Sequence, residues 1–98
     1  MVNLYRRGRI AEKKIVNYLK SKGFRNIRRS KGSRGPADIY ARKMDTKYYI
    51  QVKYGTARAS RDEIKRLRKL AKDRGGVAVV IHRDKRGKNI WKFYGRWK

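Results

Sequence analysis

The sequence contains no cysteine, a single histidine and only seven aspartate and glutamate residues. The absence of cysteine excludes disulfides and thiolate metal sites, and leaves the redox compartment open. One histidine, His82, excludes His-rich metal-ligand spacing. The sequence also has no apolar run long enough to cross a bilayer and no signal-peptide pattern, so we expect a soluble intracellular protein.

Positive charge dominates what the sequence does contain. Thirty-one Lys and Arg face seven acids, which gives a formal net charge of +24. Such a field destabilises the compact state, and binding to a polyanion relieves it. Nucleic acid is the favoured partner; an anionic membrane surface is the alternative, but no segment combines a strong apolar face with a basic one. The patterned 39% hydrophobic content excludes a disordered basic tail.

The length of 98 residues suggests one domain, 1–98. Apolar periodicity predicts a helix over 4–21, and a capping box from Ser60 to Glu63 opens a second helix that continues to about residue 74. The expected strands are 24–28, 37–42, 48–54, 77–81 and 89–94. The element order α-β-β-β-α-β-β predicts an α/β sandwich around a central mixed sheet.

Two of the seven acids stand in unusual places. Glu12 precedes Ile15 by three residues and Leu19 by seven, so it lies on the helix stripe expected to face the sheet. The alternative is an acid favoured by the dipole near a helix N-terminus. Asp38 stands inside an expected strand, which aspartate normally avoids, although a turn residue at strand entry is the alternative.

Gln51 and Lys53 interrupt an aromatic and β-branched strand, and they project from the same face. A solvent-exposed face would explain both residues. However, Tyr49 shares that face, and partial burial of the amide and the ammonium would require partners.

A hairpin can bring these residues together. It would place Asp38 next to Gln51 and Lys53, while the first helix packs above them and delivers Glu12. Two carboxylates and an amide oxygen form a hard-oxygen site suited to Mg²⁺ or Mn²⁺. An adjacent ammonium can orient an attacking water or stabilise charge on a phosphate. In a chain of this charge, the set suggests metal-dependent phosphodiester hydrolysis.

The ordered motifs resemble the PD-(D/E)xK nuclease superfamily, and within it the archaeal Holliday junction resolvases. One anchor is the segment YRRGRIAE at 5–12, followed by a helix and Lys-Gly-Phe at 22–24. The others are RSKGS at 29–33, ADIYA at 37–41 and IQVK at 50–53. The resemblance covers nearly the whole chain and implies a restriction-endonuclease-like fold.

The resemblance also implies residue roles. Glu12, Asp38 and Gln51, with the Val52 carbonyl, would hold Mg²⁺, for which Mn²⁺ can substitute. Lys53 would be the catalytic lysine, and Ser30 or Ser33 would act near the scissile phosphate together with Arg29. The residues expected to bind DNA are Arg6, Arg7, Arg9, Lys13, Arg29, Lys31, Ser33 and Arg34.

Gln51 departs from the resolvase pattern, which usually has glutamate at this position. The change removes a formal negative charge, although a carbonyl oxygen still ligates a metal. A glutamine here also resembles the Mrr-type restriction endonucleases of the same superfamily.

These features predict an Mg²⁺-dependent DNA endonuclease that cleaves branched DNA, such as four-way junctions. We expect a homodimer, because symmetric junction cleavage needs two sites. We expect it to be cytoplasmic and associated with the nucleoid. The alternatives are an Mrr-like duplex endonuclease and a non-catalytic basic protein that binds nucleic acid, of ribosomal, chromatin or junction-binding type.

Overall fold

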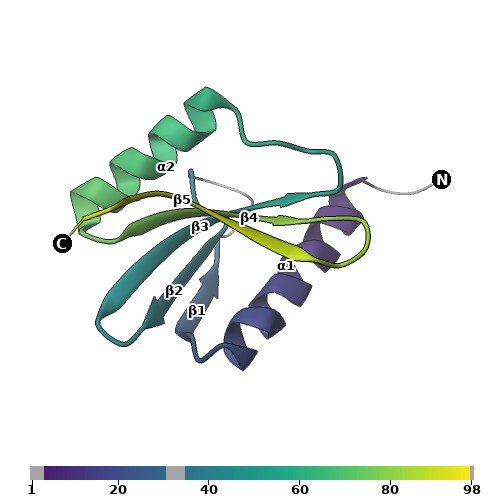
Figure 1. Ribbon diagram of the computed structural model, residues 1–98, viewed down its shortest axis with the longest axis horizontal. Coiled ribbons are helices and arrows are strands. Elements are labelled where there is room, and N and C mark those ends of the chain that lie inside the picture. Colours follow the sequence, from purple (N-terminus) through teal and green to yellow (C-terminus); the bar gives the residue numbers. More distant parts are fainter. Residues whose placement is uncertain (1–3, 31–34, 98) are drawn as a thin grey trace.

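The computed structural model describes the backbone of residues 4–30 and 35–97, and the side chains of those ranges from Glu12 onward. The element order is the predicted α-β-β-β-α-β-β. In chain order, the elements are α1 (Leu4–Ser21), β1 (Arg25–Arg29), β2 (Ile39–Lys43), β3 (Thr46–Tyr54), α2 (Arg61–Arg74), β4 (Val77–Arg83) and β5 (Asn89–Arg96). Figure 1 shows the two helices on opposite sides of the sheet.

The five strands form one mixed sheet, as predicted, in the order β1-β2-β3-β4-β5. The pairs β1–β2, β2–β3 and β4–β5 are antiparallel, whereas β3 and β4 are parallel. A parallel pair requires a crossover connection, and α2 provides it. In the described part of the chain, neither helix is long and apolar enough to cross a membrane.

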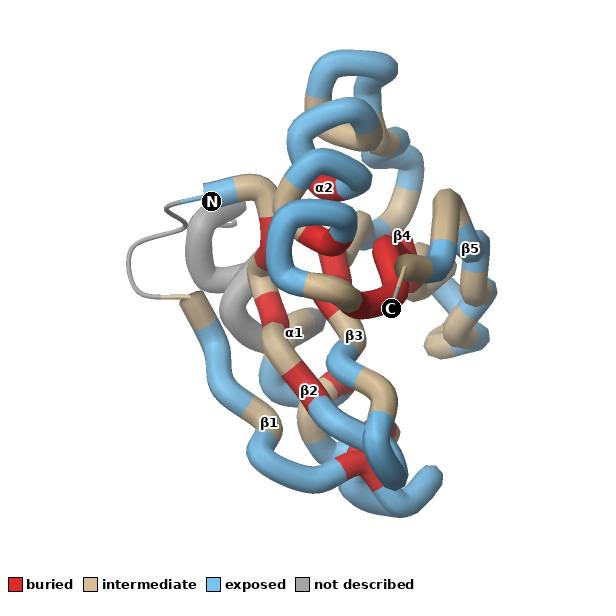
Figure 2. The backbone as a smooth tube through the Cα atoms, turned by 90° about the vertical axis from the view of Figure 1, so that its left-hand side faces the viewer, coloured by how far each residue is buried: buried red, intermediate tan, exposed pale blue. Residues whose placement is uncertain are grey.

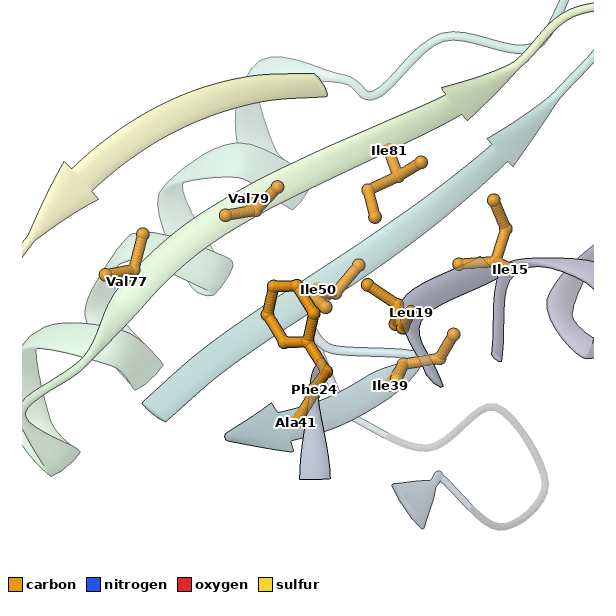
Figure 3. Packing of buried hydrophobic residues seen from close by; sticks show 9 residues of the cluster. All are labelled: Ile15, Leu19, Phe24, Ile39, Ala41, Ile50, Val77, Val79 and Ile81. Atoms are coloured by element: carbon orange, nitrogen blue, oxygen red, sulfur yellow. The ribbon is translucent and has the colours of Figure 1, made fainter. Parts of the chain in front are cut away.

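One face of the sheet packs against α1. Ile15 and Leu19 of α1 are fully buried against Ile39, Ile50 and Ile81 of the sheet (Figure 3). The spacing of the two helix residues puts them on a single stripe, so the helix buries one face and leaves Lys13, Lys14 and Lys20 exposed. This layer holds the larger of the two hydrophobic clusters.

The other face packs against α2 through smaller residues. Leu67 and Ala71 contact the layer formed by Tyr49, Ala78 and Val80, and Figure 2 shows these buried segments beneath the exposed outer turns of α2. The helix begins at the predicted capping box and ends at Gly75, whose φ of +70° suits glycine.

Several strand limits differ from the predictions. Strand β2 begins at Ile39, two residues later than expected, so Asp38 lies just outside the strand. The hairpin turn is tight, with Met44 at φ +55°, and therefore β3 starts at Thr46. Strands β4 and β5 extend beyond their apolar cores because they pair with each other as far as Arg83 and Arg96.

Candidate active site

The β2–β3 hairpin places Asp38 against the strand that carries Gln51 and Lys53. Ile39 pairs with Ile50, so Asp38 lies one step further, beside Gln51. The Oδ2 atom of Asp38 accepts a hydrogen bond of 2.8 Å from the backbone N–H of Val52. The hairpin thus brings together the residues expected to meet there.

Gln51 and Lys53 point to the α2 side of the sheet. Their neighbour Ile50 packs against α1, and side chains alternate between the two faces along a strand. Both polar residues donate hydrogen bonds to the same atom, Oε2 of Glu63 on α2, at 2.5 Å from Gln51 Nε2 and 2.7 Å from Lys53 Nζ. The helix that contacts this part of the site is therefore α2, whereas α1 had been expected to pack above it.

The sequence predicts Glu63 only as part of the capping box of α2, and the structure confirms that capping role. Ser60 N–H donates to Glu63 Oε1 at 3.0 Å, and Glu63 N–H donates to Ser60 Oγ at 3.1 Å. A second signal was available in the sequence. Glu63 precedes Leu67 by four residues and so lies on the sheet-facing stripe of its helix. The same spacing had singled out Glu12 on the first helix.

The pKa values of the two acids in this cluster are shifted in opposite directions. Burial raises the pKa of Asp38, although the Val52 N–H and the Lys53 charge oppose the shift. Burial is also the largest single influence on the pKa of Glu63, and it acts to raise that pKa. The hydrogen bonds from Lys53 and Ser60 together outweigh it, so the pKa of Glu63 lies below its ordinary value. Glu63 is thus an anion at neutral pH.

Gln51 has an unpaired acceptor. Its side chain is 6% exposed, and its Oε1 atom is buried with no hydrogen-bond partner. Leaving a buried carbonyl oxygen unpaired costs roughly 1–3 kcal/mol. The described residues include no group of three or more His, Cys, Asp and Glu side chains that would hold a metal. A cation here would therefore need amide and backbone carbonyl oxygens, and Gln51 Oε1 is an oxygen of this kind.

The structure also describes three other predicted residues, on α1 and at the end of β1. Glu12 is half-buried on α1, which begins at the end of the sheet where β3 ends (Figure 1). The backbone N–H of Ser30 donates to the carbonyl of Asp38 at 2.8 Å, which places Ser30 beside the site. Arg29 is exposed at the end of β1.

The remaining predicted residues are less informative. Lys13 is exposed on α1. Lys31, Ser33 and Arg34 lie outside the described residues, as do the side chains of Arg6, Arg7 and Arg9.

A cationic groove of about 620 Å³ lies next to the cluster. Tyr40 pairs with Tyr49 and with Arg28, so the three side chains share the α2 face of the sheet. Ser30 lines the groove, and its N–H donates to the carbonyl of Asp38, so the groove adjoins the cluster. The groove is also lined by Arg42, Lys47 and Arg74, and none of its described lining residues is an acid.

Comparisons with known proteins identify the family and the fold. Residues 9–92 match the PD-(D/E)XK superfamily domain. Among solved structures, the chain is similar to Hjc of Archaeoglobus fulgidus, described as a Holliday junction resolvase from an archaeal hyperthermophile. The two are 28% identical with a TM-score of 0.69, over 86% of this chain and 73% of the other. No curated protein sequence matches.

The likeness to Hjc confirms the restriction-endonuclease-like fold, and the matched domain covers most of the sequence. Both agree with the resemblance that the motifs had indicated. The chain belongs to the PD-(D/E)XK nuclease superfamily.

Proposed function

We propose that this protein is a metal-dependent, structure-specific DNA endonuclease that hydrolyses phosphodiester bonds in branched DNA. Its favoured substrate is the four-way junction, its metal is Mg²⁺ and its active form is a homodimer. This function is supported by membership of a nuclease superfamily and by the structural likeness to a protein described as a Holliday junction resolvase.

The observation that carries the proposal is the unpaired Oε1 of Gln51. This atom is buried on the same strand as Lys53 and next to Asp38, at the position where the superfamily motif has an acid. In a purely structural cluster, an acceptor buried this deeply would be expected to have a donor. A cation that binds Oε1 would satisfy it.

Hard oxygen atoms make the site suitable for Mg²⁺. Asp38, Gln51 Oε1 and the carbonyl of Val52 would hold the ion, with Glu12 as a further carboxylate from α1. A bound Mg²⁺ lowers the pKa of a water ligand and stabilises negative charge on a phosphate. It would also favour the ionised form of Asp38, whose pKa burial raises.

Lys53 supplies a cation that the protein itself positions. Its ammonium lies 2.7 Å from Glu63 Oε2, so the flexible side chain is fixed in direction before any substrate binds. The ammonium of Lys53 lies on the same strand face as Gln51. There it would orient the attacking water and neutralise charge on the scissile phosphate.

The groove beside the site gives the DNA strand a path. Arg28, Arg42, Lys47 and Arg74 would contact phosphates, and Tyr40 would stack on a sugar or base. Backbone contacts of this kind read the shape of DNA and not its sequence. They suit a substrate defined by branching.

The deciding experiment compares labelled four-way junction and duplex DNA, each with and without Mg²⁺. We expect cleavage of the junction only when the metal is present, and no cleavage by Asp38→Asn, which should still bind the DNA. Equal cleavage of duplex and junction would favour an Mrr-like endonuclease. Salt-sensitive binding without cleavage in Mg²⁺ or Mn²⁺ would instead identify a non-catalytic nucleic-acid-binding protein, which the net charge of +24 also favours.

A further inference from the structure

We propose that Glu63 is a positioning residue of the metal site, and that it carries from α2 the negative charge that Gln51 does not provide on β3. The inference rests on the proposed function, because it concerns the metal that the nuclease would bind. It extends the site to a second helix and makes residues 51 and 63 a coupled pair.

Glu63 fixes the direction of the Gln51 amide. Its Nε2 donates to Glu63 Oε2 at 2.5 Å. If the amide were turned over, its carbonyl oxygen would face the carboxylate at the same distance, and the two acceptors would repel each other. Glu63 therefore decides that Oε1 points away from α2, where it is buried and unpaired. Groups that orient a metal ligand in this way control metal affinity.

The charge of Glu63 also suits a neutral residue at position 51. If residue 51 were glutamate, its carboxylate would lie within hydrogen-bonding distance of Glu63, and two carboxylates so close cannot both ionise readily. Glutamine at 51 therefore suits glutamate at 63. The cluster keeps two acids, Asp38 and Glu63, and Lys53 keeps an anionic partner at 2.7 Å.

The two carboxylate oxygens of Glu63 divide this role from helix capping. Oε1 of Glu63 serves the cap by accepting from Ser60 N–H, whereas Oε2 accepts from both Gln51 and Lys53. Capping needs only one of the two oxygens, and a glutamine at this helix position also completes a capping box. A glutamine substitution therefore removes the charge and keeps the helix start.

The test measures Mn²⁺ binding to the full chain by calorimetry, without DNA, for wild type, Glu63→Gln and Asp62→Asn. Asp62 is an exposed acid of the same first turn, so its variant loses the same formal charge. We expect Glu63→Gln to weaken Mn²⁺ binding about 10-fold and Asp62→Asn to leave it unchanged. Thermal unfolding should show both variants folded.

A double-mutant cycle with Gln51→Glu tests the coupling. Gln51→Glu should raise Mn²⁺ affinity more in the Glu63→Gln background than in wild type, because the swap returns the charge to β3 beside a neutral donor. Two results would overturn the role of Glu63: additive effects of the two substitutions on Mn²⁺ affinity, or equal Mn²⁺ affinities of Glu63→Gln and Asp62→Asn. If wild type still binds Mn²⁺ and cleaves junctions, the proposed function would stand. A wild type that neither binds Mn²⁺ nor cleaves DNA would overturn the proposed function, and the inference with it.

Discussion

Asp38 is joined to the neighbouring strand by its own side chain: Oδ2 accepts the Val52 N–H at 2.8 Å. The carboxylate lies before β2 begins, so this bond replaces a regular sheet contact and holds the acid beside Gln51. The residue thereby combines a structural contact with a proposed catalytic role. An asparagine retains the acceptor and removes the charge, which allows the two to be separated.

Asp38→Asn should be more stable than wild type at neutral pH while losing cleavage. Burial raises the pKa of Asp38 above 3.8, so ionising this carboxylate costs folding free energy. The stability difference between variant and wild type should be smallest below pH 3.8, grow as the pH passes through the raised pKa, and then stay constant. Thermal unfolding from pH 3 to 8 measures it. A difference that shrinks with rising pH would contradict the burial argument.

Lys53→Met should reduce junction cleavage by about 10²–10³-fold, the usual loss for one positioned group that stabilises transition-state charge. It should also raise the pKa of Glu63, because the largest influence that lowers this pKa is the hydrogen bond from Lys53. Carboxylate titration by NMR detects the second effect independently of activity. Lys65→Met, an exposed lysine of α2, is the matched control and should change neither quantity.

Arg42→Ala combined with Arg74→Ala should weaken DNA binding and reduce its salt dependence. If each side chain contacts one phosphate in the groove, the slope of log K against log salt should fall by about 0.9 per residue on duplex DNA. Affinities measured between 50 and 200 mM salt test this. Lys85→Ala with Lys88→Ala, in the β4–β5 turn, provides an equal charge change outside the groove. Equal slopes for the two double variants would exclude the groove as a phosphate path.

Phe93→Glu should convert a dimer to a monomer if β5 forms the subunit interface. The Phe93 side chain is 60% exposed and stacks on Trp91 at a ring-centroid distance of 5.9 Å, so it offers an exposed aromatic surface for the proposed dimer interface. Analytical ultracentrifugation of the variant should show the monomer mass. Met44→Glu, at an 89% exposed position in the hairpin turn, carries the same charge change and should remain dimeric.

The helices were predicted with their observed limits because each carries its own local signals. The apolar stripe and Gly23 delimit α1, and α2 has a capping box at one end and Gly75 at the other. Strand limits were less accurate, because a strand ends where its partner stops pairing. Asp38 illustrates the difference: the composition of residues 37–42 predicts a strand that includes it, but the hairpin register leaves it outside β2.

The candidate site was only partly visible in the sequence. Asp38, Gln51 and Lys53 stood out because each breaks a local rule for strand residues. Glu63 satisfied a local rule, helix capping, and so its second role was hidden. Its contact with Gln51 and Lys53 arises only when α2 crosses back over the sheet.

The sequence by itself determined the order of the elements, the basic character of the surface and the three polar positions of the motif. Charge and apolar periodicity are properties of the chain and do not depend on how distant segments meet. The tertiary structure decided which helix covers Gln51 and Lys53, and which atom of Gln51 is left unpaired. Both depend on the packing of α2 against the sheet, because the position of Glu63 in space determines where the amide and the ammonium donate their hydrogens.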